Sequence, residues 1–347
     1  MSEGFSCPVA PATADRVLMS HGGGGRMSRR LIRDLFRRHF TSSELARDHD
    51  GAYLQTDGRL LAFTTDSFVV SPPFFPGGDI GSLAIHGTVN DLAACGARAR
   101  WLSAAFVLEE GLPMSELERI VVSMAKAAST AGVEIVAGDT KVVERGKGDG
   151  IFITTTGIGT LWTDRPPDPR AVLPGDVVLL SGSIGEHGMA ILSRREGLAF
   201  ESELTSDSAP LGDLVEAVYR AGVHPRCLRD PTRGGVAAAL AEIAEASQTG
   251  IELDESAIPV AALVRGACEI LGLDPLLVAN EGKMLFIVAP EDAETALAAL
   301  RSHPLGKLAA KVGRVQGDEP GCLLIRTELG SVFVMDIPAG EELPRIC

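Results

Sequence analysis

Three aspartates in the first half of the chain share a sequence pattern that could bind a divalent cation. Asp66 and Asp139 each follow an apolar, strand-like run, and Asp91 lies inside an apolar helical segment. Carboxylates at strand ends can gather at one edge of a sheet, where they would hold Mg²⁺ against phosphate oxygens. Spacing alone favours the alternative that they cap helices and form turns. Asp91 stands apart, because a charge within so apolar a helix needs a partner or a metal.

Two glycine-containing segments precede predicted helices and could bind phosphate through their backbone N–H groups. The first is the run Gly22, Gly23, Gly24 and Gly25, and the second is the segment Asp230-Pro-Thr-Arg-Gly-Gly235. The first is not a Walker A motif, since no Gly-Lys-Ser/Thr follows it, and it could equally be a flexible linker. For the second, the alternative to phosphate binding is that Asp230 or Thr232 is simply the N-cap of the following helix.

Two charged residues could take part in catalysis beside these segments. Lys141 follows Asp139 by two positions, so on an extended segment both side chains would project to the same face. Glu281 lies in the segment Asn280-Glu281-Gly282, just before a predicted strand. Each could instead be a solvated surface charge, and residue type alone does not decide between these readings.

The last residue of the chain, Cys347, is a candidate nucleophile. The chain has six cysteines with neither a C-x-x-C pair nor a Cys/His cluster, so neither a disulfide framework nor a structural zinc site is indicated. Five of them are interpreted as small, mostly buried apolar residues. A cysteine at the terminus needs another explanation.

The elements that must position these residues are strands and helices mixed along the whole chain. Apolar patterning predicts strands at 60–65, 101–108, 133–137, 151–159, 176–181, 283–288, 322–326 and 331–335. It predicts helices at 27–40, 80–95, 114–131, 212–221, 234–247, 260–271 and 292–301. This mixture predicts two α/β or α+β domains.

Composition and punctuation divide the chain into five parts. A flexible N-terminus (1–17) precedes a first domain (18–162). A proline-rich linker, Thr163–Arg170, follows it and leads to a second domain (171–337) and a tail (338–347). The tail has two prolines and no periodic pattern, so we expect it to be extended and mobile. At roughly 3.3 Å per residue it would reach up to about 33 Å.

Composition also narrows the class of protein. The 347 residues are 45% hydrophobic, enough for a sizeable core, and the net charge is −14. That charge argues against a nucleic-acid partner, which needs clustered Lys and Arg. No apolar run approaches the roughly 18 residues that span a bilayer, and the N-terminus does not have the pattern of a secretory signal. We therefore expect a cytoplasmic protein without a membrane contact.

Several segments taken together resemble the HypE family of hydrogenase maturation proteins, from about residue 16 to the last residue. They are His21–Met27, Thr65–Ser67, Ile85–Ala93, Ala137–Val142, Ser181–Gly188, Arg229–Gly235, Ala279–Gly282 and the terminal Pro-Arg-Ile-Cys. Single segments recur in aminoimidazole ribonucleotide synthetase, selenophosphate synthetase and thiamine-monophosphate kinase. The terminal Pro-Arg-Ile-Cys is the element that discriminates between these relatives.

The resemblance implies a fold and a ligand set. The fold is α/β (α+β), with two domains of the aminoimidazole ribonucleotide synthetase (PurM-like) type, mixed sheets flanked by helices and a flexible C-terminal tail. The family forms homodimers through its N-terminal domains and binds ATP between the domains. Carried over by motif, Asp66, Asp91 and Asp139 would hold Mg²⁺–ATP, and the loop Gly22–Gly25 would cover the triphosphate. Thr140, Asp230 and Asn280 would complete the nucleotide site.

The resemblance also implies a reaction. A carbamoyltransferase, HypF, would load Cys347 with a carboxamide, which this chain would dehydrate to a thiocyanate with ATP. Glu281 would be the base, and Lys141 would stabilise negative charge. The product would deliver cyanide to an iron scaffold formed by HypC and HypD, for the iron centre of a NiFe-hydrogenase.

Two other classes of protein remain as alternatives. One is another ATP-dependent enzyme of the same fold, a selenophosphate synthetase or a small-molecule kinase. The glycine-rich loop lacks the reactive Cys and following Lys of selenophosphate synthetase, and a small-molecule kinase would not need a terminal cysteine. The other class is a non-enzymatic nucleotide-binding scaffold whose tail docks a partner.

Overall fold

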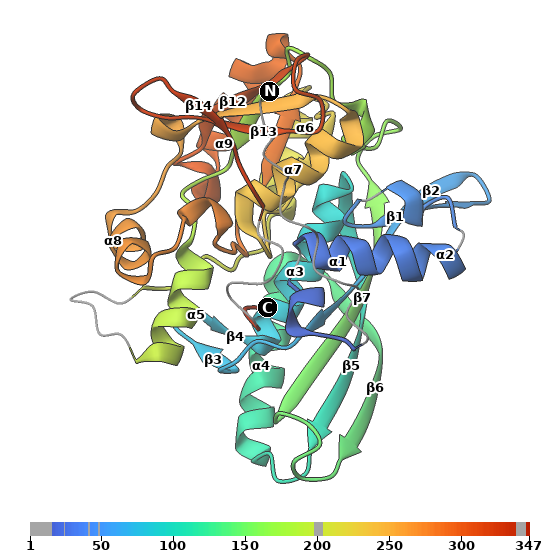
Figure 1. The fold of residues 1–347 in the computed structure, drawn as a ribbon. Coiled ribbons are helices and arrows are strands. Elements are labelled where there is room, and N and C mark those ends of the chain that lie inside the picture. Colours follow the sequence, from blue (N-terminus) through green and yellow to red (C-terminus); the bar gives the residue numbers. More distant parts are fainter. Residues whose placement is uncertain (1–15, 24, 41, 48, 198–203, 338–344) are drawn as a thin grey trace.

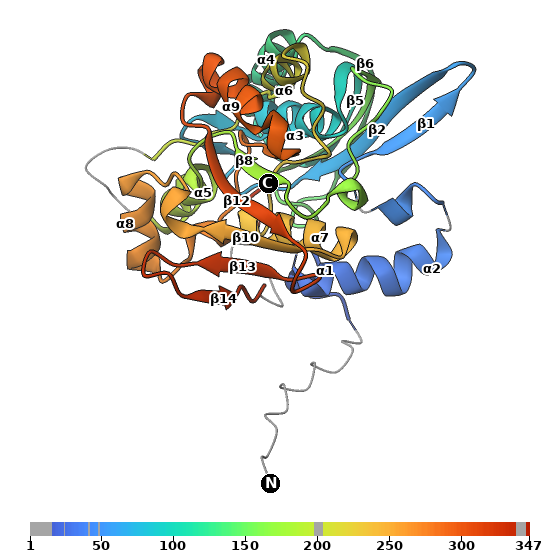
Figure 2. The same ribbon diagram turned by 90° about the horizontal axis from the view of Figure 1, so that it is seen from above.

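The computed structural model contains two sheets, each with its own helices, and describes residues 16–23, 25–40, 42–47, 49–197, 204–337 and 345–347. The N-terminal sheet has five strands in the order β1-β2-β7-β5-β6. They are β1 (Ala52–Thr56), β2 (Arg59–Phe68), β5 (Ala97–Glu109), β6 (Glu134–Val143) and β7 (Ile151–Leu161). Neighbours pair antiparallel except β5 and β6, which are parallel. In Figure 1 this sheet forms the lower right part of the molecule, and in Figure 2 the β1–β2 hairpin extends beyond it.

One face of this sheet is covered by two helices. α3 (Ile80–Ala94) begins at Asp79, whose carboxylate accepts hydrogen bonds from the N–H groups of Gly81 and Ser82. α4 (Met114–Ala131) ends at Gly132, which adopts the left-handed conformation that favours glycine. Most of α3 is buried because it lies between the sheet and α4. The opposite face of the sheet has no helix packed on it among the described residues.

The C-terminal sheet has seven strands in the order β14-β13-β10-β12-β8-β11-β9. They are β8 (Val177–Leu180), β9 (Cys227–Arg229), β10 (Gly250–Asp254), β11 (Leu285–Val288), β12 (Ala310–Gln316), β13 (Leu323–Arg326) and β14 (Val332–Val334). Residues of β8 alternate between two apolar clusters. Both faces of its central strands are therefore covered, as expected of strands that are apolar throughout.

The helices of the second domain lie on both faces of that sheet. They are α5 (Glu186–Glu196), α6 (Gly212–Arg220), α7 (Gly235–Ser247), α8 (Ala262–Leu271) and α9 (Ala293–Ser302). α7 shares a core with Val178 and Leu180, whereas α6 and α9 share one with Val177 and Leu179. The second core includes Ala93 and Ala94 from the end of α3, so it joins the two domains.

The N-terminal helix and two short strands complete the described elements of regular structure. α1 (Arg26–Leu31) continues through a π-helical turn (Ile32–Phe36) into α2 (Arg37–His39). β3 (Phe74–Phe75) and β4 (Gly78–Asp79) form a small hairpin before α3. No helix in the described part of the chain is long and apolar enough to cross a membrane.

The structure confirms most predicted helices and corrects two predicted strands. Helix 114–131 has the predicted bounds, and helix 27–40 forms with an unpredicted π-helical turn. The prediction that Asp66 and Asp139 end their strands is wrong: β2 runs on to Phe68, and β6 runs on to Val143. Helix α5 and the strands β1, β9, β10 and β12 were not predicted.

Candidate functional site

A pocket of about 530 Å³ lies between the two domains and collects most of the candidate residues. Asp66 and Asp91 line it from the N-terminal domain, Asp230 and Glu281 from the C-terminal domain, and Cys347 from the end of the chain. Figure 1 shows the C-terminus between the domains, next to α3. The volume falls within the range of small-molecule sites, roughly 300–1,000 Å³.

Three carboxylates in this pocket are close enough to share a cation. Asp50, Asp91 and Asp230 each offer an oxygen within 4.8 Å of the others. The Oγ1 atom of Thr64 lies 2.8 Å from Asp91 Oδ2 and holds that side chain in place from β2. Asp50 Oδ1 is paired with Arg229, while Asp50 Oδ2 is buried without a hydrogen-bond partner among the described residues. Oxygen-rich, anionic sites of this kind suit Mg²⁺ or Ca²⁺.

The electrostatics of the pocket match a site built for positive charge. Burial, followed by repulsion from Asp230 and Asp66, raises the pKa of Asp91 well above its usual value. Burial and repulsion from Asp50 do the same to the pKa of Asp230, and burial also raises the pKa of Asp66. Like charges in one desolvated site disfavour ionisation, and a bound cation would reverse that effect. These residues therefore fit a divalent ion.

Glu281 lies on the C-terminal side of the same pocket. Its side chain is 3% exposed, and its Oε1 atom has no hydrogen-bond partner among the described residues. Burial, then repulsion from Asp230 and Asp66, raises the pKa of Glu281 well above 4.5. A pocket-lining carboxyl with a raised pKa and an unpaired oxygen is suited to proton transfer.

Neighbouring side chains fix the segment that carries Glu281. The amide of Asn280 accepts a hydrogen bond from Gly185 N at 2.7 Å and donates one to Pro231 O at 3.0 Å. Asn280 thus joins the segment around Asp230 to the segment around Glu281 through main-chain contacts. Asp207 accepts a hydrogen bond from the Glu281 N–H at 3.1 Å.

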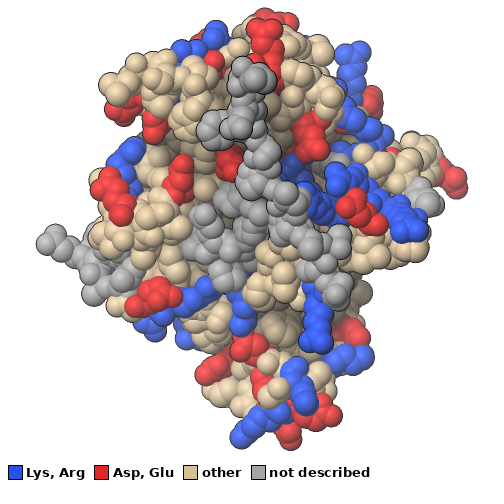
Figure 3. Space-filling view, viewed as in Figure 1, with Lys and Arg blue, Asp and Glu red and all other residues tan. Residues whose placement is uncertain are grey.

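The glycine-rich loop and the basic helix form another wall of the pocket. Gly22, Arg29 and Ile32 line it, and Arg233 from the Asp230 segment donates to Gly22 O at 2.7 Å. Gly23 and Gly25 are buried, and Gly24 lies outside the described residues. Lys and Arg side chains gather over α1 and α2 beside the interdomain region, at the right of Figure 3. A polyanion could bind against this wall.

Asp139 and Lys141 do not reach this pocket in the single chain. They lie on β6, three strands from β2, and Asp139 is in register with Ala105, Thr154 and Ser67. With about 4.8 Å between strands, that separation is about 14 Å. Asp139 also shares its sheet face with Ser67, whereas Asp66 projects to the α3 side. The structure therefore leaves Asp139 out of the carboxylate cluster and places Asp50 in it.

Asp139 and Lys141 nevertheless form a pair on the exposed face of the sheet. The Lys141 Nζ atom lies 2.7 Å from both carboxylate oxygens of Asp139, which confirms that the two side chains share a face. The side chain of Asp139 is 62% exposed and that of Lys141 is 69% exposed. Thr140, between them, donates its N–H to Asp139 Oδ1 at 2.9 Å.

The end of the chain is docked beside the carboxylates. Cys347 O accepts a hydrogen bond from Val69 N at 3.0 Å, and Ile346 is 1% exposed. The tail was predicted to be extended and mobile; its last three residues are held in the cleft, while 338–344 lie outside the described residues. A group attached to the sulfur of Cys347 would therefore lie in the pocket with Glu281 and the aspartates.

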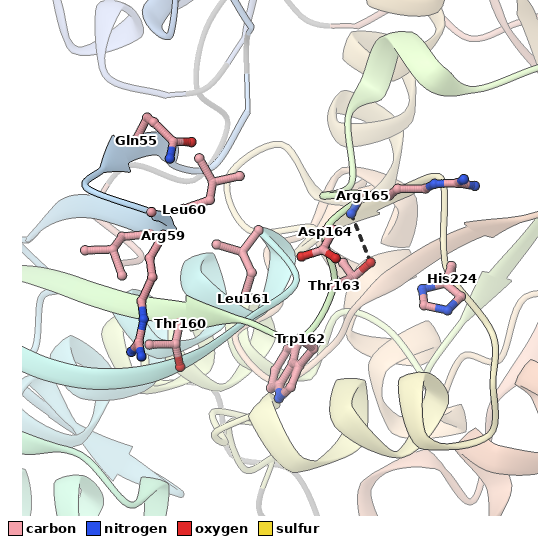
Figure 4. Close-up of a pocket in the computed structure, with 12 residues that line it drawn as sticks. Gln55, Arg59, Leu60, Thr160, Leu161, Trp162, Thr163, Asp164, Arg165 and His224 are labelled. Carbon is pink, nitrogen blue, oxygen red and sulfur yellow. Dashed lines mark hydrogen bonds between the residues drawn. The ribbon is translucent and has the colours of Figure 1, made fainter.

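A second hollow, of about 910 Å³, lies away from these residues. It is lined by the β1–β2 hairpin and the linker between the domains, and Figure 4 shows Trp162, Arg165 and His224 around it. Arg165 N donates to Thr163 Oγ1 there at 3.1 Å. This hollow has one carboxylate, Asp164, among its lining residues and no cluster that suggests catalysis.

Sequence reasoning missed three members of the site. Asp50, Arg229 and Arg233 lie in the pocket, yet only the last two fall within a segment that was singled out. Asp50 precedes Gly51 in what looks like an ordinary turn, and nothing local distinguishes it. Its role arises because β2 and α3 bring Thr64 and Asp91 next to it.

Comparison with known proteins agrees with this architecture. Residues 48–161 match the family model of the AIR synthase related protein N-terminal domain, and residues 174–323 match the C-terminal domain model. The chain is 53% identical over 333 residues to the carbamoyl dehydratase HypE of Cupriavidus necator, covering 96% of this chain and 95% of that protein.

Two crystal structures resemble the molecule in three dimensions. The first is of a HypE–HypF complex, with a TM-score of 0.85 at 47% identity, covering 89% of this chain and 99% of that chain. The second is of HypE in complex with ATP, with a TM-score of 0.81 at 50% identity, covering 96% of this chain and 100% of that chain.

Proposed function

This chain belongs to the HypE family of carbamoyl dehydratases, and we propose that it dehydrates a carboxamide carried on the sulfur of its own Cys347. It is an ATP-dependent enzyme of hydrogenase maturation. The observation that carries the proposal is the position of Cys347, which lines one pocket with Asp91, Asp230 and Glu281. The sulfur that carries the substrate group is thereby close to the residues suited to its chemistry.

The reaction converts Cys347–S–C(=O)–NH₂ into Cys347–S–C≡N. Oxide is a very poor leaving group, and transfer of the γ-phosphoryl group of ATP to the amide oxygen lets that oxygen depart as phosphate. Both N–H protons must leave as the C≡N bond forms. Glu281 is the proposed base, because its buried carboxylate has a raised pKa and an unpaired oxygen that can accept a proton.

The carboxylate cluster is the proposed site for Mg²⁺. Asp50, Asp91 and Asp230 supply three oxygens, and Asp66 lines the same pocket next to them. When bound, Mg²⁺ would neutralise charge on the triphosphate. Gly22, Gly23, Gly24 and Gly25, followed by the basic helix, are proposed to cover the phosphates with backbone N–H groups and arginines. Asn280 is proposed to act through the main chain that it positions.

Asp139, Thr140 and Lys141 are proposed to reach the site from a second copy of the chain. Asp139 and Lys141 project from a sheet face that has no helix packed on it among the described residues, and Thr140 lies between them in the strand. On that face Trp101 is 45% exposed and Val107 39% exposed. A homodimer formed through these sheets would bury them and bring β6 of one copy towards the cleft of the other. Lys141 would then stabilise negative charge on the transferring phosphoryl group.

Two partners follow from the proposed reaction. HypF is the proposed carbamoyltransferase, and the solved HypE–HypF complex supports that pairing for this chain. HypC and HypD are the proposed iron scaffold that accepts cyanide from the Cys347 thiocyanate. Both steps require Cys347 to leave its docked position.

Intact-mass spectrometry after incubation with HypF, carbamoyl phosphate and ATP tests the function. We expect a carbamoyl adduct on the wild-type chain that loses the mass of one water when Mg²⁺–ATP is present. Cys347→Ala should acquire no adduct. ATP turnover that persists unchanged in Cys347→Ala would instead indicate a small-molecule kinase or synthetase of the same fold.

A further inference from the structure

The terminal residues pair with the main chain that follows β2. Val69 N donates to Cys347 O at 3.0 Å, and Ser71 N donates to Arg345 O at 3.2 Å. Residue 69 faces 347 and residue 71 faces 345, which is an antiparallel register. The tail therefore lies antiparallel to this segment and is held by main-chain hydrogen bonds, although Arg345 has a left-handed φ of 57° and the tail is not a strand of either sheet.

Two side chains of α5 donate hydrogen bonds to carbonyl groups of the docked tail. The His187 Nε2 atom lies 2.9 Å from Ile346 O, and its Nδ1 atom lies 2.7 Å from Ser206 Oγ. With the Ser206 hydroxyl donating to Nδ1, a neutral imidazole donates from Nε2 to the tail. Arg195 Nη2 donates to Arg345 O at 2.9 Å and to Ser71 O at 2.7 Å, so it bridges the tail and the segment that follows β2.

The side chains of the tail add sequence specificity to this pairing. The Arg345 guanidinium forms an ion pair with Asp149, from the loop between β6 and β7, and its Nε donates to Val69 O at 3.0 Å. The Ile346 side chain is buried in the apolar cluster of the N-terminal domain. A residue without positive charge at position 345, or without an apolar side chain at position 346, would lose the ion pair or the apolar burial, so the dock favours a basic residue followed by an apolar one.

We propose that Val69, Ser71, Asp149, His187 and Arg195 form a docking site for the terminal Arg-Ile-Cys, in which His187 and Arg195 are positioning residues for dehydration. The contacts described above engage the main chain and residues 345 and 346. The positioning role rests on the proposed function, whereas the docking role does not.

Thiol alkylation of the full-length protein tests the docking role. His187→Ala and Arg195→Ala should each raise the rate at which a maleimide modifies Cys347 by about tenfold, as expected for the loss of one or two hydrogen bonds. Peptide mass spectrometry separates Cys347 from the other cysteines. Arg194→Ala, at the exposed neighbouring position on α5, is the matched control and should leave the rate unchanged. Equal Cys347 alkylation in all four proteins would overturn the dock.

Single-turnover dehydration of the carbamoylated protein tests the positioning role. Both variants should lose about tenfold in dehydration rate with the KM for ATP unchanged, and Arg195→Lys should recover part of the loss. Faster alkylation with unchanged dehydration would overturn the positioning role. Ile346→Ser alters only the tail and should reproduce both effects, so a folding defect in the α5 variants cannot mimic them. If the wild type does not dehydrate, the proposed function fails while alkylation still tests the dock.

Discussion

Glu281 and the aspartates around it hold negative charge in a place where water cannot screen it. Glu281, Asp91 and Asp230 all have carboxyl groups whose pKa is raised well above the usual value, mainly by burial. For an aspartate that binds a cation, the raised pKa reflects an unfavourable free energy of ionisation in the ligand-free site, which a bound cation would offset. For a general base it is an asset, because a proton acceptor works best when its pKa approaches the working pH.

Glu281→Gln is expected to abolish dehydration and to leave loading and ATP binding intact. The amide keeps the shape of the side chain but cannot accept the proton, so the dehydration rate should fall by a factor on the order of 10²–10⁴. Single-turnover mass spectrometry of the carbamoylated chain measures it. In the wild type the rate should increase as the pH rises through the raised pKa of Glu281, since only the deprotonated form is a base.

The control for this variant is Glu255→Gln, which changes an exposed carboxylate in the C-terminal domain. It should dehydrate at the wild-type rate. A Glu281→Gln enzyme with an unchanged rate and pH profile would assign the proton transfer to another group.

Asp91→Asn is expected to stabilise the ligand-free protein and to abolish Mg²⁺-dependent ATP binding. Because the pKa of Asp91 is higher in the folded chain, the unfolded chain loses its proton first. The free energy of unfolding then decreases as pH rises from about 4 through the folded pKa. At pH 7 the amide removes this penalty, so the ligand-free variant should be the more stable protein. Thermal denaturation with and without Mg²⁺–ATP measures both effects.

Asp57→Asn, in the exposed turn between β1 and β2, is the control and should change neither quantity. If Asp91→Asn still gained stability from Mg²⁺–ATP to the wild-type extent, the carboxylate cluster would not be the cation site.

At this scale the sequence identifies a residue when its immediate neighbours make it anomalous. Asp91 stands out because its helix is otherwise apolar, and Cys347 because it is the last residue. Asp50 and Asp139 show the limit: their environments are set by residues distant in the sequence. Asp50 contacts Thr64 and Arg229, which are distant from it in the sequence. Asp139 lies on the opposite face of the N-terminal sheet from Asp66.

Strand β6 is the element on which the proposed assembly depends. It carries Asp139 and Lys141 on a solvent-exposed face, about 14 Å in the plane of the sheet from Ser67 and on the other side from Asp66. A single chain cannot join these residues without breaking the sheet. A second copy can supply them without any such change.

Mixing two inactive variants tests whether Lys141 acts across the dimer. Lys141→Ala and Glu281→Gln should each lack dehydration alone. After dissociation and reassociation, half of the dimers would be mixed, and each mixed dimer would contain one intact site, restoring about a quarter of wild-type activity. Mass spectrometry of the carbamoylated mixture measures it. No recovery from dimers shown to be mixed would mean that Lys141 serves the site of its own chain.

Local patterning predicts elements well when their ends carry chemical signals. α4 has its predicted bounds because Gly132 ends it in a left-handed conformation. β6 extends past the predicted strand 133–137 because Gly138 does not end it. A Cβ atom there would lie 2.7 Å from Ala104 O on β5, so the glycine permits close pairing within the sheet.

In the whole molecule one chemical centre lies where three parts of the chain meet. The N-terminal domain supplies Asp50 and Asp91, the C-terminal domain supplies Asp230 and Glu281, and the tail supplies Cys347. The order of elements and the two-domain division follow from the sequence. The meeting of these parts does not, because it depends on the interdomain core around Ala93 and on the exposed sheet face.

Val107→Arg is expected to separate the proposed homodimer and to abolish dehydration. Val107 is paired with Lys141 in the parallel β5–β6 ladder and is 39% exposed, so an arginine there would place extra positive charge on the face that two copies are proposed to share. Size-exclusion chromatography with light scattering should show a monomer. Docking of the tail, measured by alkylation of Cys347, should persist because its contacts lie within one chain.

Val334→Arg is the matched control, since Val334 is a 55% exposed valine on β14 of the other sheet. It should leave both the oligomeric state, measured by light scattering, and the dehydration activity unchanged. A Val107→Arg monomer that still dehydrates its loaded tail would show that one chain is catalytically complete, and Lys141 would then have no role in trans. Loss of activity together with dimer dissociation, while Cys347 remains docked, would show that docking is a property of one chain and catalysis a property of two.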